Sequence, residues 1–232
     1  MSDPLRIALV AEGPTDRIVI EAVLRAVLDD RTFVLKQLQP EGSLAFGEFG
    51  GGWTGVYRWC KQAAKRGRGR LARDGLLFEN YDLLILHVDA DVAGMSYGDN
   101  AITPQDSDGA LPCERPCPPA TATTDALRAV LLSWCGESAP PPRTVTCMPS
   151  KSTEAWVVTA LFPNDRAMKP QIECYANPAS RLGQQPKRRR IRKSQRDYQA
   201  ASGRLEQAWR RLAGDGGLGE ARRSEAEFMA AL

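Results

Sequence analysis

The stretch LRIALVAEGPTDRIVI, residues 5–20, joins two apolar segments through a short polar sequence. Residues 5–11 have the length and composition of a buried strand, and the residues after Thr15 have the apolar content of a helix. Glu12 follows the strand, Gly13 permits a sharp turn, and Asp16 lies in the first helical turn. A strand that leads directly into a helix is typical of an α/β fold, in which ligands collect where the strands end.

Strand-like and helix-like segments alternate along the first two thirds of the chain. The predicted strands cover residues 5–11, 33–39, 81–91 and 143–148. The predicted helices cover residues 16–29, 53–65, 123–134 and 153–161, with Thr15 as N-cap of the first. This order predicts a Rossmann-like α/β domain with a mostly parallel sheet and helices on both faces.

The domain is expected to span residues 1–162 and to include a long loop or lid at 92–120, which is rich in Gly, Pro, Asp and Ser. Residues 163–232 are more basic and polar, and we expect them to form a C-terminal extension with helices near 198–213 and 221–231.

Composition narrows the functional class. The 232 residues carry a net charge of +3 and contain no apolar stretch that approaches the roughly 20 residues of a membrane span. We therefore expect a cytoplasmic protein without a membrane partner, in which all cysteines are reduced thiols. The spacing of Cys113 and Cys117 in a proline-rich loop favours ordinary loop cysteines over a zinc site.

Positive charge is concentrated in two runs. Residues 61–73 carry six basic groups and residues 187–196 carry seven, and neither run contains an acid. Such runs are typical either of solvated faces or of surfaces that bind a polyanion. The second run predicts a nucleic-acid contact through Lys187, Arg188, Arg189, Arg190, Arg192 and Lys193.

Acidic residues stand at the ends of two predicted strands. Glu12 follows the first strand, and Asp89 and Asp91 end the third. On an extended chain, Asp89 and Asp91 point to the same side, and parallel strands bring their carboxyl ends to one edge of the sheet. Carboxylates placed so closely favour a divalent cation, and hard oxygen ligands suit Mg²⁺ or Mn²⁺.

Several neighbouring residues have two interpretations. Alternation puts His87 on the side of Asp89, although a hydrogen-bonded core histidine is the favoured interpretation. Asp16 and Glu154 are either metal ligands or acids that complement a helix dipole. Lys151 is either a phosphate contact or a solvated lysine. Trp53 and Tyr57, one helical turn apart, favour core packing over base stacking.

These residues resemble the Toprim domain, which topoisomerases, bacterial primases and nucleases of the overcoming-lysogenisation-defect type share. Glu12-Gly13-x-Thr15-Asp16 and Asp89-x-Asp91 carry the resemblance, which covers residues 5–161. It implies metal or acid/base roles for Glu12 and an Mg²⁺ site at the aspartate pair. Ser150, Ser152 and Glu154 are candidates for a second metal. The segment 152–156 is also similar to small Toprim-like proteins associated with anti-phage defence.

We therefore expect an Mg²⁺- or Mn²⁺-dependent nuclease that acts on DNA or RNA. The predicted catalytic residues are Glu12, Asp89, Asp91 and Lys151, and the predicted metal ligands are Glu12, Asp16, Asp89, Asp91 and Glu154. The alternative is a non-enzymatic nucleic-acid-binding subunit of a defence or toxin system, with a structural metal and a partner protein. A sugar transferase that uses Asp89-x-Asp91 is disfavoured because it leaves Glu12 and Asp16 unexplained.

Overall fold

A four-stranded sheet, parallel throughout, forms the centre of the protein. The computed structural model describes residues 3–28, 31–41, 47–165, 172–215 and 230. The strands are β1 (Leu5–Val10), β2 (Phe33–Gln39), β3 (Leu83–His87) and β4 (Thr144–Cys147), in the order β2-β1-β3-β4. The predicted α/β class is confirmed.

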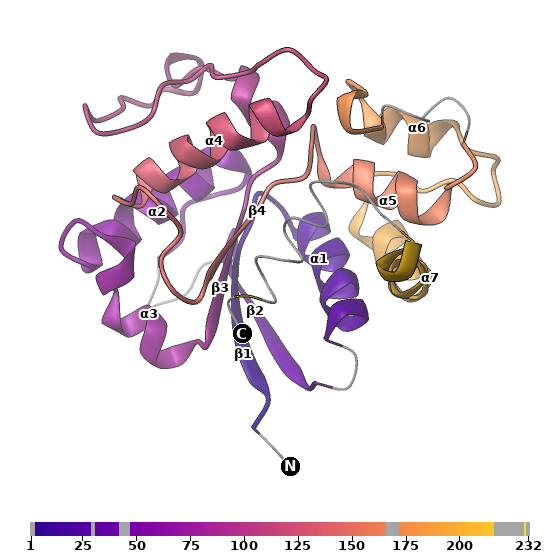
Figure 1. The fold of residues 1–232 in the computed structure, drawn as a ribbon, viewed down its shortest axis with the longest axis horizontal. Coiled ribbons are helices and arrows are strands. Elements are labelled where there is room, and N and C mark those ends of the chain that lie inside the picture. Colours follow the sequence, from indigo (N-terminus) through magenta and orange to yellow (C-terminus); the bar gives the residue numbers. More distant parts are fainter. Residues whose placement is uncertain (1–2, 29–30, 42–46, 166–171, 216–229, 231–232) are drawn as a thin grey trace.

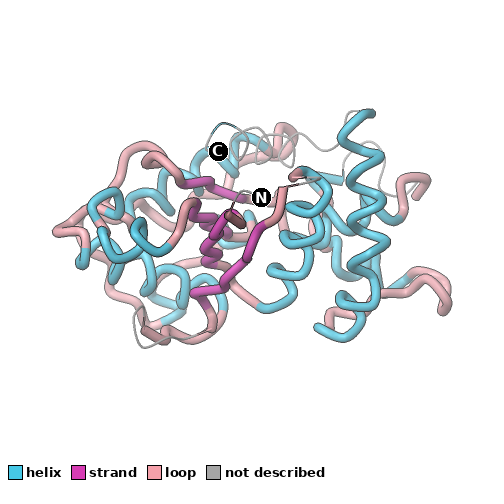
Figure 2. The backbone as a smooth tube through the Cα atoms, turned by 90° about the horizontal axis from the view of Figure 1, so that it is seen from below, coloured by secondary structure: helices cyan, strands magenta, loops and turns pink. Residues whose placement is uncertain are grey.

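Helices cover both faces of this sheet, as Figures 1 and 2 show. One side carries α1 (Pro14–Val27), α5 (Thr153–Leu161), α6 (Pro178–Gln184) and α7 (Gln195–Asp215). The other carries α2 (Gly52–Arg66), α3 (Gly75–Asn80) and α4 (Thr121–Trp134). The sequence did not predict the short helices α3 and α6, and the helix expected near 221–231 lies outside the described residues. None of the described helices has the length and apolarity to cross a bilayer.

The apolar run that forms β1 is divided between two cores. Ile7 and Leu9 face α1, α5 and α7, whereas Ala8 and Val10 face α2 and α4. All four side chains are fully buried. A strand covered on both faces needs apolar residues at successive positions, which explains why β1 shows no polar alternation.

The aromatic residues of α2 belong to the second core, which lies between the sheet and the helices α2 and α4. Trp53 and Tyr57 are buried, and both rings pack against Tyr97 and Trp134 with centroid separations of 5.4–6.1 Å. Core packing, the favoured interpretation for this pair, is therefore what the structure shows.

The strand order reverses between β1 and β3. From β1 the chain crosses through α1 to β2 on one side, and it later enters β3 on the other side of β1. Adjacent loops diverge at such a point, so open α/β sheets commonly bind ligands there. Glu12 follows β1 and Asp89 follows β3, and the reversal therefore brings the two predicted acids to one edge of the sheet.

The C-terminal residues contribute to the first core. Helix α7 packs against α1 and α5. It buries Tyr198, Leu205 and Trp209, and the Trp209 ring meets Trp156 of α5 at a centroid distance of 5.9 Å. The part of residues 163–232 that the structure describes thus shares a core with the sheet.

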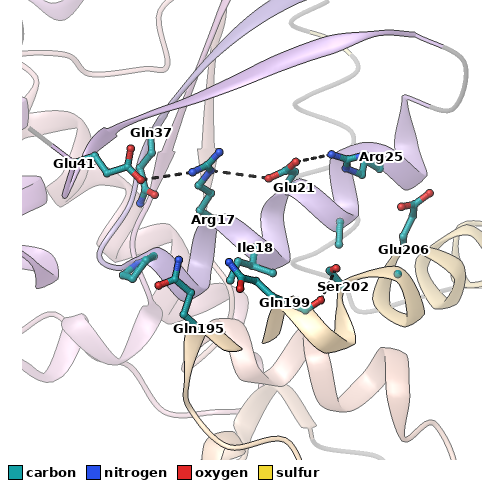
Figure 3. A pocket seen from close by; sticks show the side chains of 13 residues that line it. Arg17, Ile18, Glu21, Arg25, Gln37, Glu41, Gln195, Gln199, Ser202 and Glu206 are labelled. Carbon is teal, nitrogen blue, oxygen red and sulfur yellow. Dashed lines mark hydrogen bonds and ion pairs between the residues drawn. The ribbon is translucent and has the colours of Figure 1, made fainter. Parts of the chain in front are cut away.

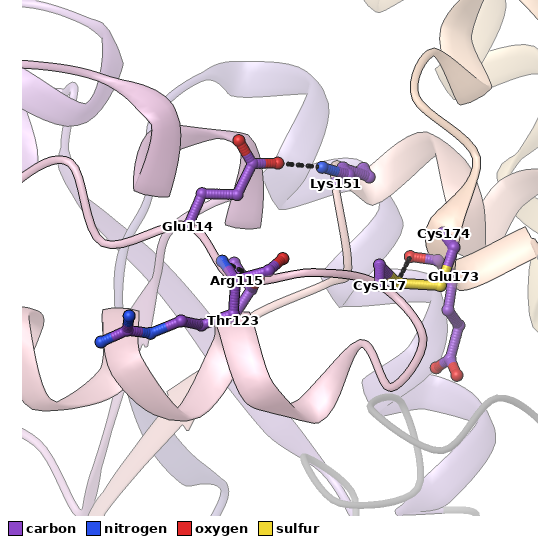
Figure 4. Close-up of a disulfide and its surroundings, with 7 residues drawn as sticks. All are labelled: Glu114, Arg115, Cys117, Thr123, Lys151, Glu173 and Cys174. Atoms are coloured by element: carbon purple, nitrogen blue, oxygen red, sulfur yellow. Dashed lines mark hydrogen bonds and ion pairs between the residues drawn. A yellow bond between two sulfur atoms is a disulfide. The ribbon is translucent and has the colours of Figure 1, made fainter.

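The loop at 92–120 has local structure near its start and a covalent link near its end. The 3₁₀ turn Ala90–Gly94 leads into it, and a second 3₁₀ turn covers Gly98–Asn100. Near its other end, Cys117 forms a disulfide with Cys174, 57 residues further along the chain (Figure 4). The prediction that all six cysteines are thiols was therefore wrong for this pair. Spacing could not reveal the bond, because it depends on where the fold brings two distant loops together.

We predict that removing a core side chain of α7 destabilises the whole protein. Leu205 is fully buried, so Leu205→Ala is expected to lower the free energy of unfolding by about 2–5 kcal/mol in chemical denaturation. Gln207→Ala, on the exposed face of the same helix, is the matched control and should leave it nearly unchanged. A Leu205→Ala protein as stable as the wild type would show that α7 is dispensable for the core.

Candidate metal centre

Glu12 connects the ends of β1 and β3. Its Oε1 accepts a hydrogen bond from the backbone N–H of Asp89 at 2.8 Å, and its backbone carbonyl accepts one from Gly52 at 2.8 Å. Burial opposes ionisation of the carboxyl, and the charges of Asp16 and Asp91 add to this, so that the pKa of Glu12 rises from 4.5 to about 8. Glu12 can therefore hold or release a proton near neutral pH.

Asp16 is directed into the same region from the first turn of α1. Its Oδ2 accepts a hydrogen bond from the backbone N–H of Gly13 at 2.8 Å, and its Oδ1 lies 3.2 Å from the Thr153 hydroxyl. Gly13, instead of the predicted Thr15, is the N-cap residue. Asp16 thus satisfies a free N–H at the helix start and also faces the end of β3, so the two interpretations of this residue are compatible.

Asp89 is the more buried of the two predicted aspartates. Its Oδ1 accepts hydrogen bonds from the backbone N–H of Thr153 at 2.9 Å and from the hydroxyl of the same residue at 3.1 Å. Burial, followed by the charges of Asp16 and Glu12, raises the pKa of Asp89 well above its ordinary value. Without a cation, the carboxyl is therefore held in surroundings that disfavour its charge.

His87, the last residue of β3, lies beside these aspartates. It is fully buried, with Nε2 3.1 Å from the Thr153 hydroxyl and 3.6 Å from Asp89 Oδ1. Burial lowers its pKa, which favours the neutral imidazole that metals bind. The favoured interpretation, a hydrogen-bonded core histidine, describes its burial correctly but missed its place in the site.

Three of these side chains form a compact group of potential ligands. Asp16, His87 and Asp89 each offer one ligand atom, and the three atoms lie within 4.8 Å of one another. The Thr153 hydroxyl lies among them but has one proton, so it can donate to only one carboxylate at a time. The group Asp16–His87–Asp89 could therefore hold a metal ion, which would neutralise charge that Thr153 cannot.

Asp91 reaches this region by a different path from the one predicted. The strand ends at His87, and Asp91 lies in the 3₁₀ turn Ala90–Gly94, where it is exposed. The expectation that an extended chain places Asp89 and Asp91 on one side was therefore wrong. Asp91 nevertheless lies near enough for its charge to raise the pKa values of Glu12 and Asp89, from the solvent side of the group.

The loop between β4 and α5 completes the surroundings. The Lys151 carbonyl accepts a hydrogen bond from Asp91 N–H, and the Lys151 ammonium pairs with Glu114 of the 92–120 loop at 2.5 Å (Figure 4). Lys151 thus connects this loop to the site, and its predicted catalytic role stays a prediction. Ser150, a predicted candidate for a second metal, is buried, and within the described part of the chain its hydroxyl has no hydrogen-bond partner.

Glu154, also predicted as a metal ligand, is held mainly by the C-terminal part of the chain. Its Oε1 accepts a hydrogen bond from the Tyr198 hydroxyl at 2.8 Å and lies 3.3 Å from Lys193 Nζ. Burial opposes its ionisation, but the Lys193 charge and hydrogen bonds from Ser152, Tyr198 and Lys193 outweigh it and lower the pKa of Glu154. Its Oε2 is buried, and no hydrogen-bond partner for it lies among the described residues.

The basic run 187–193 is divided between solvent and the site. Lys187, Arg188 and Arg192 are exposed. Arg189 and Arg190 are exposed too, but they donate to the backbone carbonyls of Leu161 and Gln185. Lys193 alone of these six contacts an acid of the site in the interactions that the structure records.

A cavity of about 440 Å³ lies next to the site, between α1 and α7 (Figure 3). Arg17 and Arg25 line it, and both pair with Glu21, while Arg17 also pairs with Glu41. Glu206 also lines the cavity, so the lining carries three acids and two arginines, a net charge of −1 that does not favour an anionic ligand.

His87, Thr153 and Tyr198 are the site residues that sequence reasoning did not assign. Alternation along the strand gave a signal for His87. Thr153 was visible only as the start of a predicted helix, and nothing in the sequence linked Tyr198 to the acids. Comparisons with protein-family models, curated proteins and solved structures gave no match to this chain.

We predict that the metal-free protein loses stability as the pH rises from roughly 5 to 8. The folded-state pKa of Glu12 is raised, so the folded state binds more protons than the unfolded state in this window, and deprotonation favours unfolding. One such group contributes a slope of at most about 1.4 kcal/mol per pH unit. Glu12→Gln should flatten the slope measured by urea denaturation in chelator. An unchanged slope would show that Glu12 is not the titrating group.

Proposed function

We propose that this protein is a metal-dependent phosphodiesterase that cleaves nucleic acid. The observation that carries the proposal is the meeting of Glu12, Asp16, His87 and Asp89 at the edge of the sheet where the strand order reverses. Acids at such a point commonly serve ligand binding. The Toprim resemblance of Glu12, Asp16 and Asp89 agrees with the proposal.

The donor set fits a divalent cation. The potential ligands Asp16, His87 and Asp89 are buried, and Glu12 and Asp91 stand beside them. Carboxylate oxygens outnumber the single imidazole, which favours Mg²⁺ or Mn²⁺ over softer metals. Such an ion, when bound, would neutralise phosphate charge and lower the pKa of water.

The chain's own residues divide the remaining tasks. Glu12, with a pKa of about 8, can exchange a proton with a nucleophile or leaving group near neutral pH. Thr153 orients Asp89 through its backbone N–H. Asp91 is exposed where a substrate would approach.

A basic groove supports nucleic acid as the substrate. Between α5 and α7 lies a depression of about 500 Å³, and the described residues that line it include Arg189, Arg204 and Arg211 and no acid. Phosphates of a strand would be attracted to such a surface. Because Glu154 and Leu161 lie at opposite ends of α5, the groove is roughly 10 Å along the helix from the acids, within a few nucleotides of the site.

The second candidate is a non-enzymatic nucleic-acid-binding subunit with a structural metal. The burial of Asp16, His87 and Asp89 favours it, because structural metal sites are closed, whereas catalytic sites keep an open position. The exposed Asp91 and the partly exposed Glu12 favour the enzyme. Three further points stay predictions: that the substrate is DNA or RNA, that a partner protein exists, and that the protein acts in phage defence.

We predict that the purified protein cleaves a labelled DNA or RNA strand with Mg²⁺ or Mn²⁺. Glu12→Gln should lower the cleavage rate by about 10²–10⁴-fold, as expected for loss of one acid/base group, while strand binding persists. Asp89→Asn should abolish cleavage and the rise in melting temperature that Mn²⁺ gives the wild type. Asp99→Asn, an exposed aspartate of the 92–120 loop, is the control and should behave as wild type.

The enzyme proposal fails if the wild type binds nucleic acid and metal but never cleaves, alone or with co-purifying protein. A stabilising response to Zn²⁺ alone would contradict the choice of metal.

We predict that the arginine groove contributes to strand binding. Arg204→Gln should weaken binding and reduce the log–log salt slope by about 0.7–0.9, the value for loss of one phosphate contact. Arg31→Gln is the matched control, since Arg31 is exposed before β2, at the opposite edge of the sheet. Equal salt slopes for both variants would show that the groove does not contact the phosphates of the strand.

A further inference from the structure

Lys193 is the one predicted nucleic-acid contact that lies against the acidic centre. Its ammonium is 3.3 Å from Glu154 Oε1, and its charge also interacts with Asp89 and Asp16. A lysine that binds phosphate is expected to face solvent and to have no carboxylate beside its ammonium group. Lys193 instead neutralises acids of the site, which a role in phosphate binding does not explain.

The ammonium approaches from the solvent side. The Lys193 side chain is 61% exposed, whereas the Glu154 side chain is 3% exposed. A buried carboxylate normally requires a cation or several hydrogen bonds to stay charged. Lys193 supplies that cation at the mouth of the site, where Glu154 would otherwise attract a second divalent ion.

The fold fixes this placement through the segment that precedes α7. Arg189 donates to the carbonyl of Leu161, at the C-terminal end of α5, and Lys193 reaches Glu154 at the N-terminal end of the same helix. Between them, Ile191 is buried in the first core. Tyr198 of α7 then donates to the same Glu154 oxygen. Lys193 from the segment before α7 and Tyr198 from α7 itself therefore converge on one carboxylate.

The second oxygen of Glu154 would become available to a divalent ion only if the Lys193 ammonium, which repels such an ion, were removed. Glu154 is 2% exposed, and its Oε2 has no hydrogen-bond partner among the residues that the structure describes. A cation at that oxygen would satisfy it.

We infer that Lys193 is a built-in cation of this centre. The group Asp16–His87–Asp89 holds one divalent ion, and the Lys193 ammonium takes the place of a second ion at Glu154. The inference rests on the metal centre of the proposed function, and it adds the number of divalent ions that the centre binds. It assigns Glu154 to Lys193 instead of to a metal, and it removes Lys193 from the set of phosphate contacts.

The test counts bound Mn²⁺ by electron paramagnetic resonance on the full-length chain. The wild type should bind one ion. Lys193→Met should bind two, because Glu154 then keeps only neutral hydrogen-bond donors and no cation. Lys193→Met with Glu154→Gln should return to one, and Lys193→Arg, which keeps the charge, should bind one. Arg192→Met, an exposed cation at the next position, is the matched control and should bind one ion.

Two ions in the wild type, or one ion in Lys193→Met, would overturn the inference and leave the nuclease proposal standing. No ion in the wild type would instead refute the metal centre itself. If Lys193→Met fails to fold, Glu154→Gln decides the question: it should still bind one ion, and loss of that ion would show that Glu154 is a metal ligand.

Discussion

The crowding of carboxyl groups at the ends of β1 and β3 is the constraint on which the rest of the structure depends. Glu12, Asp16 and Asp89 share a region that water reaches poorly, and burial together with mutual repulsion raises the pKa values of Glu12 and Asp89. A protein gains no stability from such an arrangement without a cation. The neighbouring elements are therefore best understood by how they hold, orient or neutralise these groups.

Helices from both halves of the chain serve this purpose. The first turn of α1 directs Asp16 inward, and the start of α5 supplies Thr153, whose N–H and hydroxyl both reach Asp89. The C-terminal segment adds Lys193 and Tyr198 at Glu154. Because α7 is anchored in the core through Leu205 and Trp209, it keeps these two residues in place. Core packing and the chemistry of the site thus depend on one another.

Much of this could be predicted from the sequence, and the limits have physical causes. Apolar runs predicted β1 to within one residue, because a strand buried on both faces has a distinctive composition, and they predicted both ends of β2. The positions of Glu12 after the first strand and Asp89 after the third correctly placed both acids at one edge of the sheet. Asp91 was misplaced because local alternation cannot reveal that the strand ends at His87.

Residues that depend on distant packing were beyond sequence reasoning. Tyr198 meets Glu154 across 44 positions, and Cys117 meets Cys174 across 57, so neither contact leaves a local pattern. His87 had a signal, but an isolated histidine in an apolar strand is also compatible with a core position. The Toprim resemblance and the nuclease activity remain predictions, which were made from the residues and their arrangement.

The central claim is that a metal ion binds at the group Asp16–His87–Asp89. The chain contains one histidine, so imidazole nitrogen coupled to bound Mn²⁺ can come from His87 alone. Electron spin-echo envelope modulation of the Mn²⁺ complex measures this coupling directly. The wild type is expected to give an imidazole ¹⁴N signal, and His87→Gln is expected to lose it. Bound Mn²⁺ without that signal would contradict the account and place the ion elsewhere.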